Sequence, residues 1–224
     1  MIIAKFAIVV ALGYLLGSIP FGLLIGRRSA KVDVREHGSG RTGATNVLRT
    51  VGKKAAATVV ILDLSKGVLA VIFAGLIMRG DYLMIGEFGL GMLLAQVLAA
   101  LAAVLGHIFP IFVKFKGGRG VATFFGGLIA LCPVAAIFGG EILLIGAGLT
   151  RYASFGSIVG AVGTYTVLIP LTIFSGFPLE YLIYALLGTI IIIVMHRDNI
   201  VRLMHGKERK LGKKVKTGDL SPSV

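Results

Sequence analysis

The chain has 224 residues, of which 56% are hydrophobic and only 15% are charged. A water-soluble fold of this length needs more polar surface than that, so we expect an all-α integral membrane protein. The charge is biased, with 23 Lys and Arg against 10 Asp and Glu. This excess suits an anionic lipid or substrate, whereas nucleic acid is the least favoured partner because the basic residues sit in short loops between apolar runs.

Apolar runs predict the membrane segments. A spanning helix needs about 20 apolar residues for a hydrocarbon core of roughly 30 Å. Five runs meet this length: residues 1–26, 55–78, 88–113, 155–174 and 179–195. A sixth run, residues 121–149, is unusual because it contains Pro133 and the pair Gly139-Gly140.

The charge of the loops predicts whether residues 121–149 cross the membrane once or return to the side from which they enter. Twenty of the 23 basic residues lie in four regions: residues 27–54, 114–119, 151 and 197–216. The positive-inside rule places these regions in the cytoplasm, so residues 121–149 must enter and return. Because 29 residues give only about 43 Å of helix, less than two crossings, we expect two half-depth helices that reverse near Gly139-Gly140. The prediction is a seven-helix bundle with its amino terminus outside and its carboxyl terminus in the cytoplasm.

Two loops predict anion binding. In residues 37–49, Gly alternates with Ser, Thr, Asn and Arg, so that backbone N–H groups and neutral donors can approach an anion. A flexible, basic, lipid-facing loop is the alternative, but it explains only the arginines. In residues 114–123, a glycine-rich turn leads into a helix, whose amino terminus favours phosphate. The alternative is that this loop only sets the orientation of the protein in the membrane. Lys and Arg alone would do that, so this alternative does not explain the glycines.

Three further sets of polar residues lie near the predicted cytoplasmic face. Ser154 begins a helix, where Ser is usually a cap, and His196 and Asn199 share one helical face. Asp63 and Lys66, three residues apart in an apolar run, neutralise one another and support the site. With the two loops, these residues would form a pocket for more than one phosphate group.

Seven motifs in order give a resemblance. The chain resembles the bacterial acyl-phosphate:glycerol-3-phosphate acyltransferase family, the PlsY family, which implies a seven-helix membrane bundle. The motifs are residues 17–22, 38–46, 63–67, 106–110, 115–123, 151–154 and 196–203.

The resemblance implies a reaction and a set of site residues. A fatty acyl group passes from acyl phosphate to the 1-hydroxyl of sn-glycerol 3-phosphate, giving lysophosphatidic acid and phosphate, with no cofactor. The implied catalytic residues are Lys116, Ser154, His196 and Asn199. The implied substrate-binding and phosphate-binding residues are Ser39, Gly40, Thr45, Asn46, Arg49, Gly117, Gly118, Arg119 and Gly120, the three glycines of the second loop supplying backbone donors.

The proton acceptor stays open between His196 and a substrate phosphate. Five residues after each of the four His there is no Asp, which excludes the acyltransferases that use a His-x-x-x-x-Asp pair. We also expect no buried Asp–His dyad, which favours the substrate phosphate, and no metal site.

The resemblance further implies a multi-pass protein of the bacterial plasma membrane, in contact with membrane lipid, with the site facing the cytoplasm. It also implies a functional link to an enzyme that makes acyl phosphate. Residues 1–211 are expected to form one domain and residues 212–224 a basic tail. The alternative function is a transporter of an organic phosphate, which would need a midplane site with access from both sides.

Overall fold

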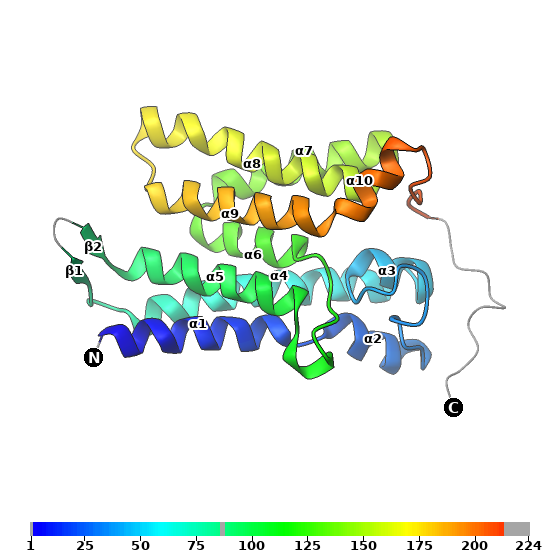
Figure 1. Ribbon diagram of the computed structural model, residues 1–224, viewed down its shortest axis with the longest axis horizontal. Helices are drawn as coiled ribbons and strands as arrows, with labels where there is room; N and C mark the ends of the chain where they lie inside the picture. The colour runs from blue at the N-terminus through cyan, green and yellow to red at the C-terminus, as the bar shows by residue number, and fades with distance from the viewer. Residues whose placement is uncertain (1, 86–87, 213–224) are drawn as a thin grey trace.

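The computed structural model describes residues 2–85 and 88–212. These residues form a bundle of long helices with α3 and α10 at one end and a short β-hairpin at the other (Figure 1). The elements are α1 Ile2–Ser18, α2 Phe21–Ala30, α3 Ala44–Thr50, α4 Lys53–Ile77, β1 Leu83–Ile85, β2 Phe88–Leu90, α5 Met92–Ile108, the 3-10 turn η1 Ile111–Val113, α6 Val121–Leu131, α7 Pro133–Thr150, α8 Ala153–Ser175, α9 Leu179–Met195 and α10 Arg197–Met204.

The chain is a multi-pass integral membrane protein. Five stretches are long and apolar enough to cross a membrane: α1 with α2, α4, α5 with η1, α7 and α8. A sixth is α9 when it is counted with α10, to which it is joined at a 60° bend, and α6 is a shorter apolar helix of 11 residues. Each of the seven expected segments therefore contains a helix.

The segment of residues 121–149 forms two helices, as expected, and the first turn of α6 and the last turn of α7 line the same cavity. The predicted reversal point is wrong, however. The helices separate at Cys132, and Pro133 begins α7, where its missing N–H and fixed φ are tolerated. Gly139 instead lies inside α7, where a Cβ would come within 1.8 Å of Thr164 Oγ1 on α8. This glycine serves helix packing, and α7, with 18 residues, is longer than a half-depth helix.

Two further boundaries differ from the prediction. The first apolar run is divided at Pro20, which separates α1 from α2. The third run starts as a strand, because β1 and β2 pair antiparallel with Leu83 opposite Leu90, and α5 begins only at Met92. Residues 213–224, almost all of the predicted tail, lie outside the described residues.

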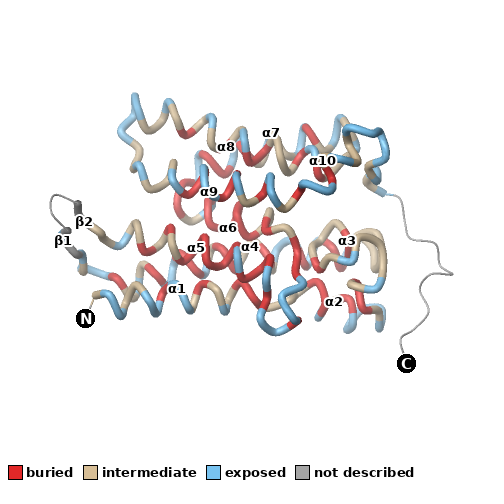
Figure 2. The backbone as a smooth tube through the Cα atoms, viewed as in Figure 1, coloured by how far each residue is buried: buried red, intermediate tan, exposed pale blue. Residues whose placement is uncertain are grey.

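Close helix contacts place α6 in the centre of the bundle, where buried residues concentrate (Figure 2). Gly67 on α4 faces the backbone of α6 so closely that a Cβ would lie 2.2 Å from the Thr123 carbonyl oxygen. On the other side, the Phe124 and Tyr184 rings stack at 5.3 Å, and the Tyr184 hydroxyl donates to the Phe124 carbonyl. These contacts fix the amino terminus of α6, which forms part of the candidate site.

Candidate active site

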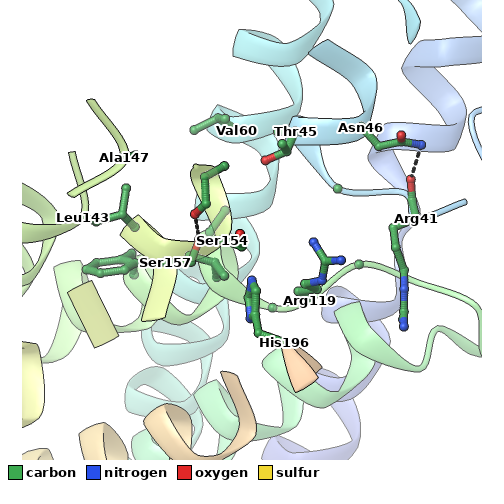
Figure 3. A pocket seen from close by; sticks show the side chains of 18 of the residues that line it. Arg41, Thr45, Asn46, Val60, Arg119, Leu143, Ala147, Ser154, Ser157 and His196 are labelled. Atoms are coloured by element: carbon green, nitrogen blue, oxygen red, sulfur yellow. Dashed lines mark hydrogen bonds between the residues drawn. The ribbon is translucent and has the colours of Figure 1, made fainter. Parts of the chain in front are cut away.

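A cavity of about 530 Å³ opens among α3, α4, α6, α7 and α8 at the α10 end of the bundle. Its volume lies within the roughly 300–1,000 Å³ typical of ligand pockets. Its polar part includes Ser39, Arg41, Thr45, Arg49, Arg119, Ser154, His196 and Asn199. Its apolar part includes Val60, Leu64, Phe125, Ile129, Leu143, Leu144 and Ala147. Figure 3 shows Arg119, His196 and Ser154 converging on this space from three separate elements.

Asn46 organises the first loop instead of offering its amide to a ligand. Its Nδ2 contacts the carbonyl oxygens of Val34, His37 and Arg41 at 2.7, 3.1 and 2.9 Å, and its Oδ1 accepts from the Ser39 N–H at 2.8 Å. Because every polar atom of the side chain is used within the protein, Asn46 shapes the loop that presents Ser39. The expectation that Asn46 binds phosphate through its amide does not fit this geometry.

The glycine-rich turn is attached to the end of α5. The Gly117 N–H donates to the Ile108 carbonyl and the Gly118 N–H to the His107 carbonyl, each at 3.1 Å. These two groups are therefore bonded within the protein, and the expectation that they donate to phosphate does not fit this geometry. Donors remain in the first turn of α6, where N–H groups have no partner within the helix. Gly120, with φ +82°, permits the sharp entry into that helix.

Two half-buried arginines make the cavity cationic. Burial lowers the pKa of Arg119 to about 10, which leaves its guanidinium group protonated at neutral pH, and burial lowers the pKa of Arg49 as well. The Nε atoms of both are buried and have no hydrogen-bond partner among the described residues. A buried donor without a partner costs free energy, on the order of 1–3 kcal/mol. A bound anion would satisfy both donors and balance both charges.

His196 follows α9, which ends at Met195, and is held in one tautomer. Its Nδ1 lies 2.8 Å from the Ile192 carbonyl oxygen, which can only accept, so Nδ1 carries the proton. Nε2 is then left with a lone pair. Burial, followed by the charge of Arg119, lowers the pKa of His196 to about 4. A neutral imidazole that can accept a proton therefore lies in the cavity.

Glu208 is a residue of this site that the sequence did not suggest. Its carboxylate accepts from Ser154 Oγ at 3.0 Å, Asn199 Nδ2 at 2.7 Å and Arg202 Nε at 2.8 Å. These hydrogen bonds outweigh partial burial and lower the pKa of Glu208. A single acidic residue among the basic residues that follow α10 was the available signal.

Ten of the thirteen predicted catalytic and binding residues line the cavity. The three that do not are Gly40, Lys116 and Gly117. Gly117 is buried within the turn, whereas Gly40 and Lys116 are exposed. The structure therefore does not bring Lys116 into the cavity wall.

Asp63 and Lys66 form the expected ion pair, with 2.8 Å between Lys66 Nζ and Asp63 Oδ1. The expectation of no buried Asp–His dyad is wrong, because His107 Nδ1 lies 3.5 Å from the same Asp63 oxygen. The two residues come from different helices, and no spacing in the sequence announces their contact. Among the described residues, no group of three or more His, Cys, Asp and Glu could hold a metal ion.

Known proteins resemble this chain over most of its length. The family model described as "Glycerol-3-phosphate acyltransferase" matches residues 7–206. Glycerol-3-phosphate acyltransferase 3 of Dehalococcoides mccartyi is 65% identical over 214 residues, which cover 96% of this chain and 99% of that protein. The glycerol-3-phosphate acyltransferase of Halalkalibacterium halodurans is 41% identical over 205 residues, covering 91% and 94%.

The fold is also similar to solved structures. The crystal structure of PlsY, an integral membrane glycerol 3-phosphate acyltransferase, in its glycerol 3-phosphate form has a TM-score of 0.79 and 36% identity, and the match covers 92% of this chain and 96% of that one. The lysophosphatidic acid form gives a TM-score of 0.78 at 36% identity, with coverage of 93% and 96%.

Proposed function

The chain belongs to the glycerol-3-phosphate acyltransferase family, and we propose that it transfers a fatty acyl group from acyl phosphate to the 1-hydroxyl of glycerol 3-phosphate. The products are lysophosphatidic acid and inorganic phosphate. The observation that carries this proposal is the continuity of one cavity from half-buried arginines to an apolar wall. Such a cavity suits a donor that is a phosphate at one end and an alkyl chain at the other.

The two parts of the cavity bind different parts of the substrates. Arg49 with Ser39, and Arg119 with the first turn of α6, hold the two phosphate groups by charge and hydrogen bonding. Apolar side chains of α4, α6 and α7, including Leu64, Phe125 and Leu143, contact the acyl chain. Burial of about 0.8 kcal/mol per CH₂ group favours binding of the chain there.

The reaction is an acyl transfer through a tetrahedral intermediate. The 1-hydroxyl oxygen of glycerol 3-phosphate attacks the acyl carbonyl carbon and forms the new ester bond. The bond from that carbon to the phosphate oxygen then breaks, and phosphate leaves with the electron pair. Arg119 and the first turn of α6 stabilise the charge that develops on this leaving group. The hydroxyl proton passes either to His196 Nε2 or to a phosphate oxygen of a substrate.

The site faces the cytoplasm of a bacterial cell in this proposal. The polar residues that line the cavity include Arg49 on α3 and Asn199 on α10. Figure 1 shows α3 and α10 at the same end of the bundle, and the positive-inside rule assigns the loops rich in Lys and Arg to the cytoplasm. With Cys132 replaced, a cysteine at Ser29 should react only from the cytoplasmic side, and one at Ser175 only from outside. Labelling of both from one side would overturn this orientation.

Purified protein in detergent tests the activity. Synthetic acyl phosphate and radiolabelled glycerol 3-phosphate, with no other cofactor, should give labelled lysophosphatidic acid. Equal or faster turnover with an acyl thioester would overturn acyl phosphate as the donor. Uptake of glycerol 3-phosphate into sealed vesicles, without acyl transfer, would favour the transporter instead. If acyl phosphate is the donor, an enzyme that produces acyl phosphates must supply it.

A further inference from the structure

Three buried polar side chains meet below the glycine-rich turn, outside the set that contacts phosphate. Lys66 Nζ lies 2.8 Å from Asp63 Oδ1 and 3.4 Å from His107 Nδ1. All three residues are at most 6% exposed. The Lys66 ammonium also lies 4.9 Å from the centroid of the Phe21 ring. The mechanism above gives this cluster no role.

The Asp63–Lys66 pair fixes the orientation of the His107 ring. Its Nδ1 lies 3.4 Å from Lys66 Nζ and 3.5 Å from Asp63 Oδ1, so one edge of the ring faces both members of the pair. Lys66 can donate to Nδ1, whereas Asp63 can accept from it. In either arrangement the edge of the ring that carries Nε2 is directed away from the pair.

The Nε2 side of the ring contacts the glycine-rich turn. A Cβ built on Gly118 would lie 2.1 Å from His107 Nε2, so the ring occupies the space that any other residue at 118 would need. The Gly118 N–H also donates to the His107 carbonyl at 3.1 Å. Both the backbone and the side chain of His107 therefore hold Gly118, and Arg119 follows it directly.

We propose that His107 is a positioning residue for acyl transfer: the Asp63–Lys66 pair orients its ring, and the ring holds the glycine-rich turn so that Arg119 and the first turn of α6 face the phosphate. This inference rests on the proposed function for its kinetic test, but its structural test does not. A displaced turn should weaken phosphate binding while the reacting groups stay in place. The KM for at least one phosphorylated substrate should then rise more than kcat falls.

A pair of substitutions tests the contact between ring and turn. His107→Asn keeps an acceptor near Lys66 and removes the atoms beside Gly118, whereas Gly118→Ala adds a methyl group that clashes with the ring. Each single variant should raise that KM about tenfold or more. In the double variant, the new methyl group fills the space left by the ring, so the KM should fall at least threefold below that of Gly118→Ala. Additive losses in correctly folded protein would overturn the proposal.

The ring of His107 supplies a readout independent of activity. In ¹⁵N-histidine-labelled full-length protein, Gly118→Ala should shift the ring ¹⁵N signals of His107, because the new methyl group displaces the ring, and should leave those of His205 unchanged. Unchanged His107 signals in folded Gly118→Ala protein would overturn the proposal, whether or not the protein transfers acyl groups. His205→Asn is the matched control for the kinetics, because this exposed histidine follows α10 and its Nδ1 lies 2.7 Å from the Val201 carbonyl oxygen, and it should leave both KM values unchanged. If the parent protein lacked acyl transfer, the proposed function would fail while the ¹⁵N test would still apply.

Discussion

Glu208 accepts a hydrogen bond from the Ser154 hydroxyl at 3.0 Å across 54 residues of sequence. This contact joins the segment after α10 to the first turn of α8. The same segment bonds elsewhere at the cavity, since the Arg209 carbonyl accepts from Arg49 and the Leu211 N–H donates to the Arg151 carbonyl. The chain after α10 therefore holds three separate parts of the site together.

Replacing Glu208 with Ala should destabilise the protein by about 1–3 kcal/mol, because donors on Ser154, Asn199 and Arg202 lose their shared acceptor. Thermal unfolding in detergent measures this loss. The pKa of Glu208 is lower in the folded protein than in the unfolded chain, where it is about 4.5. Glu208 therefore stabilises the folded protein fully above that unfolded pKa, and this stabilisation is lost as the pH falls through the folded pKa.

The matched control is Asp198→Ala, which removes an exposed carboxylate whose pair with Arg197 spans 3.7 Å. Exposed pairs contribute about 0–1 kcal/mol, so this variant should unfold close to the parent. Equal destabilisation by the two substitutions would contradict the claim that the hydrogen bonds of Glu208 stabilise the protein.

Gly140 is expected to influence acyl-chain length. It lines the apolar part of the cavity, and a Cβ there would meet nothing within 4 Å. Gly140→Leu should therefore fold normally, fill part of the cavity and shift the preference of the enzyme towards shorter acyl phosphates. Competition between donors of two chain lengths measures the shift.

Gly148 gives the matched control for that substitution. It lies on α7 as well, and a Cβ there also meets nothing within 4 Å, but it does not line the cavity. Gly148→Leu should leave the chain-length preference unchanged. The same shift in both variants would indicate a general effect on α7 and contradict the assignment of the apolar wall.

Apolar length and loop charge were enough to predict most membrane segments, because both follow from the solvent on each side of the bilayer. The reversal at Cys132 was missed, since a glycine pair in an apolar run looks the same whether it turns the chain or packs against another helix. Gly139 packs against another helix, α8. The length of the apolar run 88–113 also could not show that its first residues, from Phe88, form a strand and that the helix begins later.

Local motifs located residues that line the cavity, such as Ser39 in the first loop and Arg119 in the turn before α6, but not the partners of each residue. Residues whose role depends on a distant partner were missed. Glu208 meets Ser154, and His107 meets Asp63, only because separate helices pack side by side. The Gly117 and Gly118 N–H groups were assigned to phosphate because nothing in the sequence shows that the end of α5 uses them.

Lys116 stays a prediction from the motif, and its exposure allows a simple test. The side chain lies outside the cavity wall, so Lys116→Ala should leave thermal stability unchanged. If the ammonium contacts a bound phosphate, catalytic efficiency should fall about tenfold or more, equivalent to roughly 1.5–3 kcal/mol. Lys53→Ala, at an exposed lysine that begins α4, is the control. Unchanged kcat/KM in Lys116→Ala would exclude this residue from the site.

The identity of the proton acceptor can be decided from the pH dependence of kcat/KM, because the two candidates titrate in different ranges. The pKa of His196 is lowered to about 4, whereas the second ionisation of a phosphate monoester lies near 6. A protonated group cannot accept the hydroxyl proton, so the rate falls as the pH drops below the pKa of the acceptor.

We expect an acidic limb near pH 6 that persists, at a reduced rate, in His196→Ala. That result assigns the proton to a substrate phosphate and leaves His196 to orient the reacting groups through its Nε2 lone pair. His205→Ala, at an exposed histidine, should reproduce the parent profile. A limb near pH 4 in the parent, or loss of the limb in a folded, substrate-binding His196→Ala protein, would instead assign the proton to His196, since only removal of the titrating base can abolish the limb while binding is kept.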